Sequence, residues 1–191
     1  PNCGFRLSGR LRTTRTQGFY DGTTAAAINS VGNIKYLIFP PSTVEYYGND
    51  TQIITGIGVG TATGSLQKYY NLEVNFTGTP NTEFVYPTNL PNGRSVFVRN
   101  KLTLTNGELN LDNDHDPASG GRAIIVESDS LAAIARINGY IRSEVYDSSA
   151  CVIWRANSRV GARTIPFGYN ATSYIPYNFS LSSGNADTLF V

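Results

Sequence analysis

Three aspartates at alternate positions are the first candidates for chemistry in this sequence, which reads LNLDNDHDP around them. Asp112, Asp114 and Asp116 have the spacing that opens an EF-hand calcium loop, where carboxylate oxygens bind the ion. Pro117 then stands where that loop requires glycine, and Ala123 stands where it requires a bidentate glutamate. The pattern therefore indicates oxygen ligands but excludes an EF-hand.

Two interpretations of this acidic loop stay open. A looser calcium site would be completed by backbone carbonyls or by Glu127 or Asp129, with the weak affinity of extracellular calcium modules. A solvated turn that ends at the segment ASGG is the simpler alternative. We expect either no cofactor or calcium alone.

Nucleophilic catalysis has little support in this chain. His115, the only histidine, lies between two acids in the same polar loop, and a Ser-His-Asp or Cys-His site would have to use it. The sequence contains no G-x-S-x-G motif, and none of its acids has a spacing that indicates glycoside hydrolysis. We expect no catalytic residues, and hence no enzyme.

The two cysteines, Cys3 and Cys151, cannot form the usual zinc site with a single histidine. A disulfide within the chain or between subunits would suit a secreted protein, and two separate buried thiols are the alternative. The sequence does not decide between these.

The composition is that of a polar but weakly charged surface. Charged residues make up 15% of the 191 residues, against roughly 25% in average soluble domains. Threonine, asparagine, serine, glycine and tyrosine take their place, which suits an extracellular wall, fibre or adhesin. The chain contains no methionine and no apolar run near the ~20 residues of a membrane span. We expect a processed or excised segment of a secreted protein.

Positive charge is concentrated at the start of the chain. Arg6, Arg10, Arg12 and Arg15 lie within the first sixteen residues, which contain no acid. In a strand, the first three of these arginines share one face and the intervening leucines share the other. Such a strand either keeps an edge soluble or docks on the acidic remainder of its own or a neighbouring molecule. We expect a subunit contact here and no nucleic-acid partner, because the rest of the chain offers no matching basic surface.

Alternating apolar residues, many of them β-branched or aromatic, predict an all-β fold. The strands recur about every ten residues, as in a sandwich, barrel or solenoid. Expected strands cover residues 34–39, 42–48, 51–60, 68–76, 82–87, 94–105, 108–112, 122–128, 132–146, 150–156, 163–169 and 174–182. The segment 21–30 could hold two helical turns, and the ambiguous segment 128–137 is read mostly as strand.

Asn106-Gly107 is a strong hairpin signal, because a type I′ turn needs positive φ at both positions. A corner of a solenoid also needs positive φ, so periodicity alone leaves both open. In either case Leu102, Leu104, Leu109 and Leu111 should face one core. The adjacent tyrosines at 46–47 and 69–70 should each send one ring outward, where it would suit sugar stacking or subunit contacts.

An ordered set of short motifs extends over residues 42–182. STVEYYGNDTQIITG is followed by KYYNLEVNF and VRNKLTLTNGELNL, and then by INGYIR, a tryptophan, TIPFG and YIPYNF. This order resembles the repeats and closing module of large secreted surface proteins of the Bacteroidota. TIPFG and YIP depart from the usual forms of the closing module, and the acidic loop is not part of the pattern.

The resemblance implies an adhesin-like, surface-exposed protein exported by the type IX route. Such repeats are thought to form solenoid turns followed by a sandwich-like module. The expected division is an arm at 1–16, a solenoid-like region at 17–128 and a closing module at 129–191, the last two as one continuous domain or two. The triplets at Ser130 and Thr188 resemble the O-glycan acceptors of these bacteria.

The expected function is therefore that of a secreted structural or adhesive subunit that self-assembles into a filament or sheath. Its partners would be further copies of itself or other surface proteins. The alternative is a polysaccharide-binding module of a larger protein, with glycans as partners.

Overall fold

The computed structural model describes residues 4–15, 35–38, 40–50, 52, 54, 68–78, 96–111, 123–143, 150–169, 173–183 and 187–191, with backbone only for 4–7 and 35–38. Every regular element in these residues is a β-strand, so the all-β prediction is confirmed. The expected helical turns at 21–30 lie outside the described residues. The strands are β1 (Gly4–Leu7), β2 (Arg10–Thr13), β3 (Lys35–Ile38), β4 (Thr43–Gly48), β5 (Tyr69–Phe76), β6 (Val96–Asn106), β7 (Glu108–Asn110), β8 (Ile124–Val126), β9 (Ile134–Arg136), β10 (Tyr140–Arg142), β11 (Val152–Arg155), β12 (Gly161–Ile165), β13 (Tyr177–Leu181) and β14 (Thr188–Phe190).

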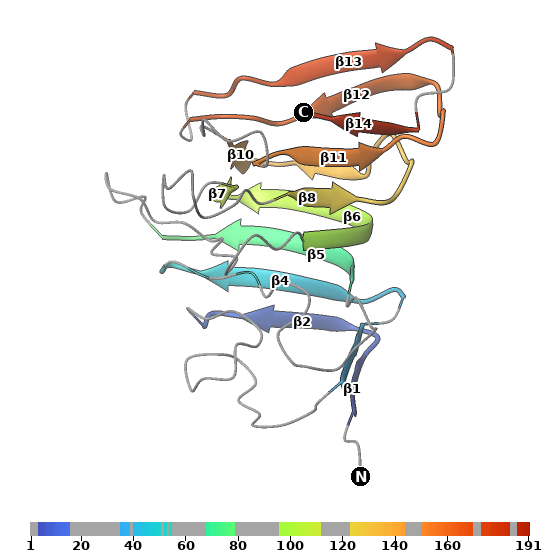
Figure 1. The fold of residues 1–191 in the computed structure, drawn as a ribbon. Coiled ribbons are helices and arrows are strands. Elements are labelled where there is room, and N and C mark those ends of the chain that lie inside the picture. Colours follow the sequence, from blue (N-terminus) through green and yellow to red (C-terminus); the bar gives the residue numbers. More distant parts are fainter. Residues whose placement is uncertain are drawn as a thin grey trace.

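The largest sheet stacks its strands almost in the order of the sequence. Its path is β14-β11-β8-β6-β5-β4-β2, and β9 also pairs with β6. Figure 1 shows these strands as successive layers, from β2 to β11. The pairings along this path are parallel, apart from the antiparallel pair of β11 and β14. Parallel neighbours need a long connection, and the paired residues Leu72 and Leu102 of β5 and β6 are accordingly about 30 positions apart in the sequence.

Two smaller parallel pairs run beside this sheet, β1 with β3 and β7 with β10. Near the C-terminal end, β12 and β13 instead form an antiparallel pair. β6 pairs with β9, β7 with β10 and β8 with β11, and residue 128 lies between the two strands of each pair in the sequence. The stack therefore runs through residue 128, and the division of the chain into three regions stays a prediction.

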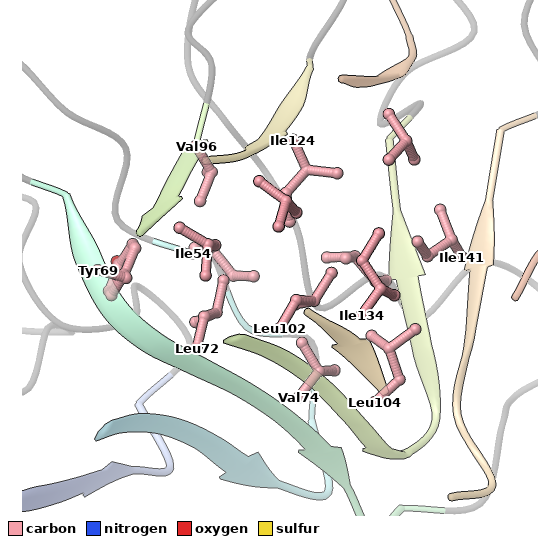
Figure 2. Close-up of a cluster of buried hydrophobic side chains, with 14 of the residues drawn as sticks. Ile54, Tyr69, Leu72, Val74, Val96, Leu102, Leu104, Ile124, Ile134 and Ile141 are labelled. Carbon is pink, nitrogen blue, oxygen red and sulfur yellow. The ribbon is translucent and has the colours of Figure 1, made fainter. Parts of the chain in front are cut away.

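The core consists of apolar side chains aligned from strand to strand. Val44, Leu72, Leu102 and Ile134 occupy equivalent positions on four neighbouring strands and are all buried. Figure 2 shows side chains of several strands meeting in this interior. Every second residue of a strand faces the same way. The alternation in the sequence therefore becomes a set of apolar columns when the strands stack.

The Asn106-Gly107 step is a corner and not a hairpin. β7 does not fold back on β6; it pairs in parallel with β10. Gly107 has a φ of 81°, whereas Asn106 is not among the described residues with positive φ, so a type I′ turn is excluded. The prediction that the leucines on both sides share one core is confirmed, since all four are buried; they are Leu102, Leu104, Leu109 and Leu111.

Replacing Gly107 with alanine is expected to destabilise the protein by about 2 kcal/mol or more, because left-handed backbone alone costs about 1–2 kcal/mol for a side chain. The added Cβ would also lie 2.4 Å from Cβ of Phe76. Gly9→Ala is the matched control, because its added Cβ would meet nothing within 4 Å. Thermal unfolding by circular dichroism compares the two; equal melting temperatures would contradict the corner geometry.

Candidate functional site

The predicted calcium ligands cannot be placed in this structure. Asp112, Asp114 and Asp116 lie outside the described residues, as does His115. Among the residues that are described, no group of three His, Cys, Asp or Glu side chains could hold a metal ion. The calcium site stays a prediction.

Cys151 is partly buried and carries a free thiol in this structure. Burial raises the pKa of this thiol, which lowers its reactivity. Cys3 lies outside the described residues, so the disulfide between the two also stays a prediction.

The arginines of β2 dock on two glutamates of the same chain. Arg10 Nη2 lies 2.7 Å from Glu45 Oε2 and 2.8 Å from Glu73 Oε2. Arg12 Nε lies 2.8 Å from Glu45 Oε2. Glu45 and Glu73 are directly opposite each other on β4 and β5, where two like charges would repel. The arginines neutralise this pair and thereby attach β2 to the stack.

Glu45 is buried even though it belongs to the outward parity of β4, with a side chain that is 1% exposed. Burial by itself would raise the pKa of this carboxyl. Hydrogen bonds from Asn75 and Arg10, together with the charges of Arg10 and Arg12, outweigh it and lower the pKa below its ordinary value. Glu45 is therefore a buried carboxylate that stays charged because Arg10, Arg12 and Asn75 surround it with hydrogen-bond donors.

The four arginines predicted to form a subunit contact differ in the contacts that the structure shows for them. Arg10 and Arg12 bind their own chain, which is one of the two docking partners that the sequence left open. The side chain of Arg6 lies outside the described residues, and the backbone N–H of Arg15 donates to Thr13 Oγ1. A contact with another subunit stays a prediction for all four.

Gln52 has a structural role that its sequence motif did not reveal. Its side chain is buried and donates from Nε2 to the backbone carbonyl of Thr13 at 2.8 Å. Gly48 makes room for it, because a Cβ there would lie 3.2 Å from the Gln52 amide. The resemblance motif contains both residues, but only the stacking of β2 on β4 gives the amide its partner.

A similar polar contact links successive layers at Asn71. Its Nδ2 donates to the carbonyl of Ser42 at 3.1 Å, and its Oδ1 accepts from Asn100 Nδ2 at 2.7 Å. Uncharged amides therefore connect three successive layers at this point, and the same Ser42 carbonyl also accepts the backbone N–H of Asn71.

Trp154 anchors the antiparallel pair β12-β13 to the stack. It is fully buried, and its ring meets the edge of Phe179 at 6.3 Å between centroids. The guanidinium of Arg163 lies 5.6 Å from the Trp154 ring. Arg163 is itself buried, and desolvation together with the charge of Arg159 lowers its pKa. The closing strands therefore share a core with the parallel layers.

The tyrosine pairs behave as the alternation predicts. Tyr46 and Tyr69 are buried and their hydroxyls lie 2.9 Å apart, whereas Tyr47 and Tyr70 are partly exposed. The more exposed tyrosines of the described residues lie on β13 and in the segment before it, positions that the sequence did not single out. We call Tyr169, Tyr174 and Tyr177 the aromatic platform; each is 39–51% exposed.

The two predicted acceptor residues for glycans are partly exposed. Ser130 lies in the turn before β9, where its Oγ accepts from the N–H of Ala132 at 3.4 Å. Thr188 opens β14 and pairs with Arg155. Their modification stays a prediction.

Comparison with known proteins adds no relatives: no family model, curated protein or solved structure matches this chain. The resemblance to Bacteroidota surface proteins therefore stays an expectation. The described residues contain no helix with the length and apolar character needed to cross a membrane.

Proposed function

We propose that this chain is a β-solenoid module of a secreted structural or adhesive surface protein, which assembles with further copies or with other surface proteins. The observation that carries the proposal is the parallel register of β2, β4, β5 and β6. Residues paired on neighbouring strands, such as Val44 with Leu72 and Leu72 with Leu102, are separated in the sequence by the length of one layer. Such a stack is stabilised by neighbouring layers and can extend in one direction.

Two further features support an extracellular scaffold. The outward positions of the central strands carry many uncharged polar residues, including Thr43, Asn71, Asn75 and Thr103. The two glutamates at outward positions of these strands, Glu45 and Glu73, are neutralised within the chain by Arg12 and Arg10. A stiff rod with few free charges on this face suits repeated packing against other copies.

We expect filaments or short rods in negative-stain electron micrographs of the purified protein. β2 is the terminal strand of the sheet among the described residues, and addition of a strand at such an edge binds through main-chain hydrogen bonds. Deletion of residues 1–16 should therefore shorten or abolish the filaments.

The deletion also uncovers Glu45, so a second variant is needed. Arg6→Gln with Arg15→Gln keeps the ion pairs of Arg10 and Arg12 and tests the remaining arm charges alone. Filaments of normal length from the deletion variant would eliminate the arm as an assembly contact. A protein that stays monomeric at every concentration would contradict self-assembly.

A polysaccharide-binding module is the second candidate function. The aromatic platform favours it, because its three tyrosines are partly exposed and lie on β13 or on the bridged backbone that precedes β13. Tyrosine presents an apolar ring with a polar rim, which suits the faces and hydroxyl groups of sugars.

A further inference from the structure

The aromatic platform lies on a backbone that holds its rings in place. Gly168 and Tyr174 form an antiparallel bridge, and the N–H of Tyr169 donates to the carbonyl of Ser173 at 3.0 Å. Tyr177 is paired with the buried Ile165 across β12 and β13. The three rings are therefore attached to paired backbone.

Rings also connect the platform to the core. Tyr177 lies 5.7 Å from Phe179 between centroids, and Phe179 meets buried Trp154 at 6.3 Å. Because Trp154 is fully buried, this row of aromatic contacts extends from the surface into the packed interior. Rigid rings lose little entropy on binding.

Two arginines lie against platform rings. The guanidinium of Arg136 on β9 is 4.1 Å from the centroid of Tyr174, and that of Arg142 on β10 is 4.9 Å from Tyr169. Contacts of this length are cation–π interactions, with the cation over one face of the ring. Tyr174 and Tyr169 are still 39% and 51% exposed, so each keeps surface that a ligand can contact beside its arginine.

One of these two arginines has a carboxylate partner and the other has none among the described residues. Arg142 lies 3.9 Å from Glu108, which also accepts a hydrogen bond from Tyr140. Arg136 is exposed and has no carboxylate partner within the described part of the chain. Two of its donor nitrogens reach only the carbonyls of Ile137 and Asn138, at 3.3 and 3.5 Å. A guanidinium has five N–H donors, so Arg136 can still bind an anion.

We propose that the aromatic platform and Arg136 bind an acidic polysaccharide, a chain that carries uronate or sulfate groups. Sugar rings would stack on the exposed surface of Tyr169 and Tyr174, the two platform rings that lie against arginines, and one acidic group would pair with Arg136. Charge complementarity selects an anionic chain over a neutral one, because Arg136 adds attraction only for the former. This binding site goes beyond the scaffold role, since it does not require self-assembly.

The test uses the full chain and three probes: polygalacturonate, dextran sulfate and neutral dextran. Isothermal titration should detect binding of polygalacturonate, dextran sulfate or both, with affinity that falls as salt is added, and much weaker binding of neutral dextran. Tyr174→Ala and Arg136→Gln should each weaken the bound anionic probe about tenfold or more. Phe190→Ala is the matched control, because Phe190 is an exposed aromatic residue on β14, outside the platform.

Emission of Trp154, the only tryptophan, shows whether each variant keeps its core. Tyr174→Phe provides a second, conservative variant that should retain most of the binding. Absence of binding to both acidic probes would overturn the proposal, as would equal affinities for anionic and neutral probes. A Tyr174→Ala variant that loses self-association but binds acidic glycans normally would reassign the platform to contacts between copies. Because filaments are not needed for this titration, its result is separate from that of electron microscopy.

Discussion

Replacing Trp154 with alanine is expected to lower the free energy of unfolding by about 3–5 kcal/mol. The side chain is fully buried, and its indole N–H donates to the carbonyl of Ser128 at 2.9 Å. Its removal opens a large cavity at the junction of β11 with β12-β13 and leaves that carbonyl without its donor. Phe179 and Arg163 lose the ring on which they pack.

Urea unfolding followed by far-UV circular dichroism measures this effect, because the variant has no tryptophan to monitor. Phe190→Ala is the control: this residue is 68% exposed on the adjacent strand β14 and should change stability by less than about 0.5 kcal/mol. Trp154→Phe should fall between the two. A loss of less than about 1 kcal/mol for Trp154→Ala would contradict a shared core.

Replacing both Arg10 and Arg12 with glutamine is expected to lower the free energy of unfolding by about 2–3 kcal/mol. Leaving a buried carboxylate without its cation typically costs about 3–5 kcal/mol. The cost here should be smaller because both arginine side chains are about half exposed, at 50% and 53%. Glu45 would keep Asn75 as a donor but would face Glu73 with no positive charge between them. The same urea unfolding, at neutral pH, gives the value.

The pH dependence of this variant is the sharper measurement. The pKa of Glu45 is lowered in the folded protein, so its contribution to stability is present above the ordinary value of about 4.3 and is lost as pH falls through the lowered pKa. Without the arginines, burial should dominate and raise the pKa of Glu45 above the ordinary value. Its contribution should then change sign, so that acidification favours the folded state at this residue.

Arg159→Gln is the matched control for the arginine variant. Arg159 is 51% exposed, as Arg10 is, but its partner Asp129 is 44% exposed at 3.5 Å. Such a surface pair contributes about 0–1 kcal/mol. If the Arg10 and Arg12 variant matched this control in both stability and pH dependence, the docking of β2 through Glu45 would be wrong.

Local pattern predicted several elements closely. The expected strands at 42–48 and 68–76 appear as β4 (Thr43–Gly48) and β5 (Tyr69–Phe76). The expected run at 132–146 is broken into β9 and β10 instead. Gly139 lies at this break, where an added Cβ would come within 3.0 Å of the Gly107 carbonyl. The close approach comes from the neighbouring layer, so the short-range pattern contains no sign of it.

The candidate sites divide in the same way. The basic face of β2 was recognisable from residue types and parity alone, but its partners Glu45 and Glu73 were not, since they lie 35 and 63 positions away. The aromatic platform was harder still. One tyrosine of each pair at 46–47 and 69–70 was expected outward, whereas the most exposed tyrosines of the described residues lie on β13 and in the segment before it, two of them against arginines.

Alternation with a period of two is a local property, and it settled that the chain is all-β and that the four leucines around Asn106-Gly107 share a core. The same property cannot say which strand lies next to which, because a hairpin and a corner both place those leucines inside. That choice depended on the pairing of β7 with β10, whose partners Glu108 and Tyr140 are 32 positions apart. Contacts between layers therefore determined the topology, the burial of Glu45 and the position of the aromatic platform.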